Sequence, residues 1–220
     1  MVRLSSAFPP DAAVNYSNIG YAALGLALER AAGRPYTALV EDGLIRPLGM
    51  TSTSFRPDPD MLSRLAKGYS EPNGGPPQTG FADAELAGGR GYKIPNGGLF
   101  STVEDLARFL AFEMGYGPPR VLAPGVIAAN FQRSFPMGPA ARYGIGFERQ
   151  PFPGGPVVGH GGAVAGYAGS VYFDPSAQVG VVCLSSRDGG CRLGPIIRAL
   201  FVVAPQRATA KPGPREPPAH

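Results

Sequence analysis

Apolar residues in the first part of the chain recur at helical spacing. Over residues 18–32, Leu24, Leu28 and Ala31 fall on one stripe, and Gly33 follows as a residue type that commonly ends a helix. Further apolar side chains widen this stripe around most of the helix. A helix that is apolar on nearly all sides is expected to be buried.

The middle of the chain mixes short helical patterns with Gly- and Pro-rich stretches. A short helix is expected over residues 36–44, and residues 51–96 are expected to be irregular because proline and glycine recur at short intervals. So long a loop in a compact domain is usually functional. A helix restarts at Ser101, which forms a capping box with Glu104, and another is expected over residues 124–131.

The last third of the chain changes to strand patterns. Strands are expected over residues 143–149, 156–161, 168–173 and 179–185. Asp174 to Gln178 is a turn signal, so the last two strands should form an antiparallel hairpin. A closing helix is expected over residues 193–203. Helices followed by antiparallel strands predict the α/β (α+β) fold class.

Composition favours a globular chain with many turns. Glycine (32) and proline (25) approach the share seen in low-complexity chains, but 44% of the 220 residues are hydrophobic and only 16% are charged. Such a chain can bury a sizeable core. We expect one domain over residues 1–204 and a disordered, Pro-rich tail over residues 205–220.

Charge and cysteine content exclude several classes of partner. The net charge of +4 owes much to Arg207, Lys211 and Arg215 in the tail, so no nucleic-acid partner is expected. No apolar run suits a transmembrane segment and no signal peptide is visible, which leaves the compartment open.

Cys183 and Cys191 are expected to be free thiols, with a disulfide as the alternative. Two histidines without a CxxC motif predict neither a metal nor a cofactor.

Two short motifs combine reactive side chains with a useful backbone setting. Tyr16-Ser17-Asn18 stands at the start of the first helix, and Gly159-His160-Gly161-Gly162 stands at the end of an apolar strand. Each is weak when taken alone. A tyrosine at a helix start is more often a packing residue than a base, and a histidine among glycines is more often a turn residue.

The order of the motifs along the chain carries more information than any one of them. They are Tyr16-Ser17-Asn18 with Gly20-Tyr21, Pro47-Leu48-Gly49-Met50 with Thr53-Ser54-Phe55, Gly97-Gly98-Leu99-Phe100-Ser101-Thr102 with Glu104-Asp105-Leu106, and His160-Gly161-Gly162 with Gly166-Tyr167. This series resembles the serine β-lactamase and penicillin-binding-protein family, in particular class C β-lactamases and their esterase, D-aminopeptidase and DD-peptidase relatives. The resemblance implies a β-lactamase/transpeptidase-like antiparallel sheet flanked by helices, with a helical subdomain.

The resemblance assigns a role to each motif residue near the helix start. Tyr16 matches the family tyrosine and would act as the catalytic acid/base relay for an acyl-enzyme reaction. Asn18 matches the asparagine of the Tyr-x-Asn motif and would bind the substrate amide or the catalytic lysine.

The strand motif is assigned in the same way. His160 takes the place of the family's strand lysine, as in the esterase and aminopeptidase branches, and is the second candidate catalytic residue. Gly161, Gly162 and Ala163 are candidate substrate-binding residues, with the Ala163 N–H facing an oxyanion. A histidine lacks the permanent charge that would attract a β-lactam carboxylate, which weakens a prediction of penicillin recognition.

The family's nucleophile motif, Ser-x-x-Lys, is absent from the sequence. The chain has three lysines, Lys67, Lys93 and Lys211, and none has a serine three positions earlier. In the family this motif precedes Tyr-x-Asn. The resemblance therefore implies a domain that is N-terminally incomplete and lacks the early strands and the nucleophile helix.

Three hypotheses follow for the function. In the first, the chain is part of a serine hydrolase of amide or ester bonds, acting on a β-lactam, a D-amino-acid peptide or an ester, inactive alone and completed by a partner chain that supplies the N-terminal part. In the second, it is a non-catalytic pseudoenzyme that binds a small molecule or peptide in the retained cleft. A third, in which Gly-His-Gly-Gly is the oxyanion motif of an α/β-hydrolase, fails because no Gly-x-Ser-x-Gly follows.

Overall fold

A computed structural model gives the fold of the chain. It describes residues 9, 14–118, 121, 126, 129, 133–152, 155–188 and 193–208. Across these residues, every helix is too short or too polar to cross a bilayer.

The helical elements come mainly from the first half of the chain. The α-helices are α1 (Asn18–Ala32), α2 (Tyr36–Val40), α3 (Pro59–Ser63), α4 (Phe81–Gly88), α5 (Val103–Ala111) and α7 (Leu193–Ala208). The π- and 3₁₀-helical segments are η1 (Glu41–Ile45), η2 (Pro72–Gly74), η3 (Gly91–Asn96) and η4 (Phe112–Tyr116).

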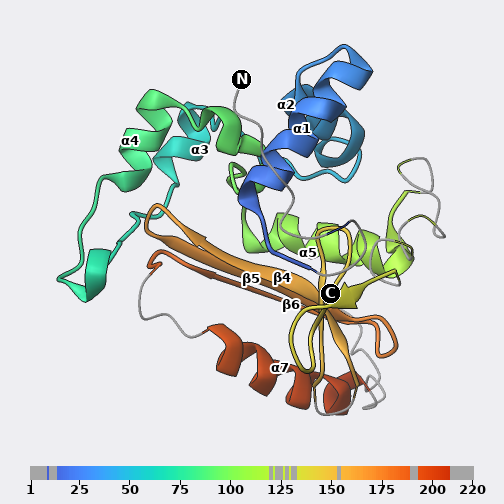
Figure 1. Cartoon of the computed structure of the whole chain (residues 1–220). Helices are drawn as coiled ribbons and strands as arrows, with labels where there is room; N and C mark the ends of the chain where they lie inside the picture. The colour runs from blue at the N-terminus through green and yellow to red at the C-terminus, as the bar shows by residue number, and fades with distance from the viewer. Residues whose placement is uncertain are drawn as a thin grey trace, which may run out of the picture.

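An antiparallel sheet forms the centre of the described molecule. Its strands are β1 (Phe135–Pro136), β2 (Arg142–Tyr143), β3 (Glu148–Gln150), β4 (Val157–Val164), β5 (Tyr167–Asp174) and β6 (Val179–Ser185), which lie side by side in chain order. The three long strands β4, β5 and β6 run between α5 and α7, which lie on opposite sides of them (Figure 1). This arrangement confirms the predicted fold class.

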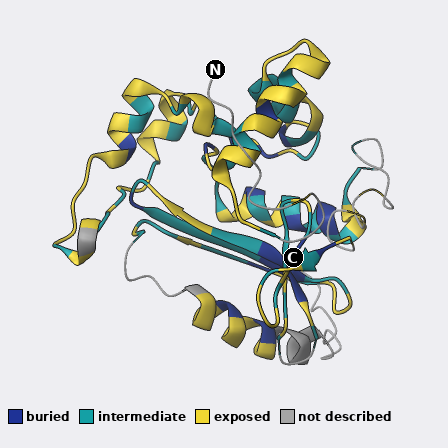
Figure 2. Ribbon diagram, in the orientation of Figure 1, coloured by how far each residue is buried: buried dark blue, intermediate teal, exposed yellow. Residues whose placement is uncertain are grey.

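Alternating side chains of the long strands build two cores, one under each helix. Val157, Val181 and Ile197 belong to the cluster beneath α7, while Leu110, Val158 and Phe173 form the cluster beneath α5. Successive residues of a strand point to opposite faces, so Val157 and Val158 separate into the two clusters. Burial is concentrated along this layer (Figure 2).

The first helix has the predicted bounds but not the predicted burial. The Ser17 side chain caps its start, and Gly33, at φ 63°, ends it in the left-handed conformation. Ile19 and Leu26 are nevertheless 63% and 50% exposed, so the expectation of a buried helix was wrong for this chain. Apolar composition predicts that a helix needs cover, whereas the main neighbours of α1 among the described residues are α2 and η3.

The expected irregular stretch contains regular helices, which corrects that prediction. Pro59 starts α3 at a position that helices favour, and Asp58 caps it. Gly80 and Gly89 flank α4 with positive φ angles of 90° and 69°. Several of the Pro and Gly residues that suggested a loop therefore mark the ends of short helices.

Two predicted boundaries differ from the structure for local reasons. The cap of α5 is Thr102, whose hydroxyl accepts a hydrogen bond from the Asp105 N–H, rather than Ser101 paired with Glu104. The strand expected over residues 143–149 is interrupted by a turn between β2 and β3, in which Gly146 adopts φ 77°.

The remaining predicted elements agree with the structure or lie partly outside it. The short helix over residues 36–44 is present as α2 followed by η1, and the hairpin of β5 and β6 is confirmed. Helix α7 continues to Ala208, past the expected end at residue 203. Most of the helix expected over residues 124–131, Cys191, and residues 209–220 of the predicted tail lie outside the described residues.

Asp105 ties the segment before α3 to α5. This carboxylate is 2% exposed and accepts hydrogen bonds from the Ser52 N–H (2.8 Å) and the Thr53 hydroxyl (2.8 Å), while Arg108 pairs with it at 2.6 Å. A buried carboxylate is retained when such partners compensate its desolvation. Asp105 is therefore a structural residue rather than a candidate catalytic acid.

Glu113 is a buried carboxyl group whose Oε2 atom has no hydrogen-bond partner among the described residues. Burial raises the pKa of Glu113 to about 7 from 4.5. The folded chain thus holds a proton that the unfolded chain releases, so stability should fall by about 3 kcal/mol as the pH rises from about 4.5 to about 7. Urea unfolding of wild type and Glu113→Gln across this range measures it, with the variant expected to lose that slope.

Glu104→Gln is the matched control, because Glu104 is an exposed carboxylate on the same helical stretch. It should keep the wild-type dependence on pH. A Glu113→Gln variant with an unchanged slope would show that another group is responsible.

Candidate active site

The candidate site begins where α1 starts. Ser17 accepts a hydrogen bond from the Gly20 N–H at 3.0 Å, which fixes the first turn of the helix. Tyr16 precedes this cap and Tyr21 lies one turn into the helix, and both line the same cavity, an arrangement like that of a hydrophobic staple. The cap therefore sets the direction in which Tyr16 leaves the helix.

The Tyr16 ring meets the two sheet residues Tyr143 and His160. Its centroid lies 6.0 Å from that of His160 and 6.1 Å from that of Tyr143. Tyr143 and His160 are in edge-to-face contact at 5.7 Å, and the Tyr143 hydroxyl lies 3.0 Å from His160 Nε2. The structure thus brings together Tyr16 and His160, the two residues expected to be catalytic, and adds Tyr143 in contact with both.

Tyr143 is a buried phenol in an otherwise accessible site. Tyr143 is 8% exposed, whereas Tyr16 is 53% exposed. Burial raises the pKa of Tyr143 well above its ordinary value, and a hydrogen bond with Tyr21 raises it further. Tyr143 therefore stays protonated at physiological pH.

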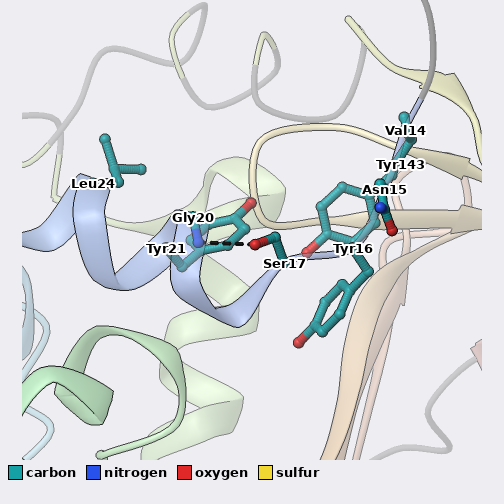
Figure 3. Close-up of a pocket in the computed structure, with 8 residues that line it drawn as sticks. All are labelled: Val14, Asn15, Tyr16, Ser17, Gly20, Tyr21, Leu24 and Tyr143. Atoms are coloured by element: carbon teal, nitrogen blue, oxygen red, sulfur yellow. Dashed lines mark hydrogen bonds between the residues drawn. The ribbon is translucent and has the colours of Figure 1, made fainter. Parts of the chain in front are cut away.

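A cavity of about 150 Å³ adjoins this cluster. Its lining comes from the start of α1 and the segment before it, with Tyr143 contributed by β2: Val14, Asn15, Tyr16, Ser17, Gly20, Tyr21, Leu24 and Tyr143 (Figure 3). Three of these side chains are tyrosines, so the cavity offers apolar ring surface together with hydroxyl groups. Such a mixture suits a small organic group better than an ion.

His160 lies in the middle of β4, as expected, and the strand continues to Val164, which corrects its expected end at residue 161. Gly161, Gly162 and Ala163 continue the strand opposite Ser170, Gly169 and Ala168 of β5. On the other side, β3 pairs with residues 157–159 of β4 alone. Among the described residues, no strand pairs with the outer edge of residues 160–164.

The turn between β4 and β5 determines which backbone groups face this open edge. Ala165 and Gly166, at φ 51° and 91°, form a two-residue loop closed by the pair Val164 and Tyr167. The closing pair of such a hairpin is hydrogen-bonded, and the pattern then alternates. The N–H and C=O groups of Ala163 and Gly161 therefore point away from β5, toward the open edge.

Hydrogen bonds from outside the hairpin hold its tip in place. Asp188 Oδ2 accepts from the Gly166 N–H at 2.8 Å and from the Ser70 hydroxyl at 2.7 Å. The Tyr167 hydroxyl donates to the Ala66 carbonyl at 2.6 Å. The edge that carries Ala163 is thus anchored close to its turn.

Asn18 is the first residue of α1 and is exposed, two positions after Tyr16. It has no described hydrogen bond to the Tyr16–Tyr143–His160 cluster.

Sequence reasoning did not identify Tyr143 or Asp188 as site residues. Tyr143 is 17 positions from His160, and their contact depends on how β2, β3 and β4 pair. We found no local signal for it in the sequence.

The described chain thus combines a helix-flanked antiparallel sheet with a helix-start tyrosine against a strand histidine. A model of the family described as Beta-lactamase matches residues 2–200. The chain therefore belongs to the β-lactamase family, and the resemblance drawn from its motifs is confirmed. This family comprises hydrolases related to β-lactamases and D-alanyl-D-alanine carboxypeptidases.

Curated relatives agree with this assignment. "Putative beta-lactamase-like 1" of Homo sapiens is 31% identical over 221 residues, which cover 95% of this chain and 42% of the human protein. "D-alanyl-D-alanine-carboxypeptidase/endopeptidase AmpH" of Escherichia coli K12 is 35% identical over 101 residues, 46% of this chain and 23% of that protein. The chain thus matches less than half the length of each.

Solved structures share the fold. The octameric penicillin-binding protein homologue from Pyrococcus abyssi superposes with a TM-score of 0.69 and 26% identity, over 88% of this chain and 42% of that one. A D-alanine carboxypeptidase from Burkholderia cenocepacia gives a TM-score of 0.72 at 20% identity, over 92% of this chain and 64% of that one.

Two glycines of β4 allow a direct test of which glycine the fold requires and which one lies at the open edge without being required for packing. A Cβ atom at Gly159 would lie 2.0 Å from the Val171 carbonyl oxygen, whereas one at Gly162 would meet nothing within 4 Å. Gly159→Ala should therefore lose more than about 2 kcal/mol of stability by overpacking, and Gly162→Ala should stay within about 1 kcal/mol of wild type. Urea unfolding of both variants measures this difference.

Equal losses in the two variants would contradict the strand register described here. Gly162 lies two positions from His160 and so on the same face of the sheet. Its missing side chain leaves space beside the histidine that the packing of the described chain does not require.

Proposed function

We propose that this chain supplies the proton-relay and substrate-binding half of a serine acyl-hydrolase site. The carrying observation is the cluster of Tyr16, Tyr143 and His160, with ring centroids 5.7–6.1 Å apart, beside the unpaired edge of β4. In this proposal Tyr16 passes the proton between the nucleophile and the leaving group.

The open edge would bind the acyl part of the substrate. The Ala163 N–H, free of β5, would donate to the carbonyl oxygen as negative charge develops on it. Gly161 and Gly162 would let the substrate backbone lie against the strand. Asn18 would bind the substrate amide from the helix side. Amide and ester bonds are the substrate class, and no metal or cofactor is needed for this acyl transfer.

In this proposal the nucleophile comes from a Ser-x-x-Lys segment, which the sequence does not contain. The sequence has no Ser-x-x-Lys, and the Ser17 hydroxyl is engaged in capping α1. The chain matches 42% of the length of its human relative, which supports a complete site that includes a further segment, in the same polypeptide or in a partner chain. The exposed apolar face of α1 is a surface that such a segment would cover.

A second function is a non-catalytic binding module. The same open edge and the 150 Å³ cavity would then hold a peptide or small ester without turnover. The absence of the nucleophile motif is the observation that favours this alternative.

Co-expression of the full chain with a Ser-x-x-Lys segment from a family member tests the proposal. Hydrolysis of a p-nitrophenyl ester and of nitrocefin should be absent for the chain alone and should appear, for the ester first, when both are present. Tyr16→Phe should then lower kcat by about 10²–10⁴-fold, because proton transfer by a positioned side chain contributes that much.

Tyr116→Phe is the matched control, since Tyr116 is similarly exposed at 67% but lies on η4, outside the cavity lining. It should leave turnover unchanged. If the pair of chains binds the ester without hydrolysing it, the binding module is correct. If the chain alone turns the ester over, it carries a nucleophile of its own and the proposal fails.

A further inference from the structure

We propose that Tyr143 is a positioning residue of this site, which holds His160 as the neutral tautomer with its proton on Nδ1. The inference deepens the proposed function and rests on it for its catalytic meaning. Its geometry concerns Tyr143, His160 and Gly161, and can be tested without any turnover.

Both ring nitrogens of His160 are engaged within the chain. Nδ1 lies 2.6 Å from the Gly161 carbonyl oxygen, and Nε2 lies 3.0 Å from the Tyr143 hydroxyl. A carbonyl oxygen can only accept, so the hydrogen between Nδ1 and Gly161 belongs to Nδ1. One proton of the imidazole is assigned by this contact alone.

The partner on the other side completes the assignment. The Tyr143 hydroxyl keeps its proton because burial disfavours the phenolate. The one proton of a neutral imidazole is the proton that Nδ1 donates to Gly161. Nε2 then carries a lone pair, and the Tyr143 hydroxyl is the donor that lies next to it. Tyr143 thus favours, together with the Gly161 carbonyl, the Nδ1–H form, although free imidazole side chains in water favour the Nε2–H form.

This tautomer limits what His160 can do for Tyr16. The planes of the Tyr16 and His160 rings are tilted by 36° to each other, and their centroids lie 6.0 Å apart. His160 then offers Tyr16 an uncharged surface, and neither nitrogen has a free lone pair for a proton of Tyr16.

The small number of histidines allows the tautomer of His160 to be measured without overlapping signals. The chain has two histidines, His160 and the C-terminal His220, and His220→Gln assigns their signals. Long-range ¹H–¹⁵N correlation spectra of the full chain, recorded at about pH 8 where imidazole is neutral, distinguish the two tautomers. Wild type should show His160 predominantly as Nδ1–H, and Tyr143→Phe should lower the share of that form, because Nε2 loses its donor while the Gly161 contact remains.

Tyr172→Phe is the matched control on the neighbouring strand. Tyr172 is 8% exposed, as Tyr143 is, and its hydroxyl donates to Glu148 rather than to His160. This variant should keep the wild-type tautomer, which separates the loss of a specific hydrogen bond from the general effect of removing a buried hydroxyl.

Two results would overturn the inference. One is an Nε2–H form of His160 in wild type, which decides the matter even where Tyr143→Phe fails to fold. The other is an unchanged tautomer in a folded Tyr143→Phe variant. Either result leaves the acyl-hydrolase proposal standing, because turnover in the co-expressed pair is measured separately.

Discussion

The pairing of β4 with β5 is the constraint on which the rest of the site depends. Gly159 permits it, because any larger residue would push against the Val171 carbonyl oxygen. The pairing places alternate residues of β4 under α5 and α7, and its two-residue turn sends the N–H of Ala163 outward. Since β3 stops opposite Gly159, the same strand is a core element in its first half and an open edge in its second.

Sequence patterns predicted elements well where the deciding forces are local. The bounds of α1 follow from the Ser17 cap and the left-handed Gly33, both visible in the sequence. The end of β4 was harder to predict, because Gly161 and Gly162 suggest the end of a strand unless their partners in β5 are known. The burial of α1 was not predictable, because its apolar side chains do not reveal what covers them.

The site shows the same division between local and long-range information. Tyr16 and His160 stood out through motif order along the chain, and the fold brings their rings together. Tyr143 lacked any such signal, since its contact with His160 arises from strand register and a turn at Gly146. The residue that orders the histidine is therefore the one that only the three-dimensional structure reveals.

The central claim is that the acid/base half of the site resides here and the acylated serine does not. Labelling with a fluorophosphonate, which modifies activated serines, followed by intact-mass and peptide mass spectrometry tests this most directly. The account predicts no adduct on the chain alone and, in the presence of a Ser-x-x-Lys segment, one adduct on that segment's serine. A stoichiometric adduct on a serine of this chain would contradict it.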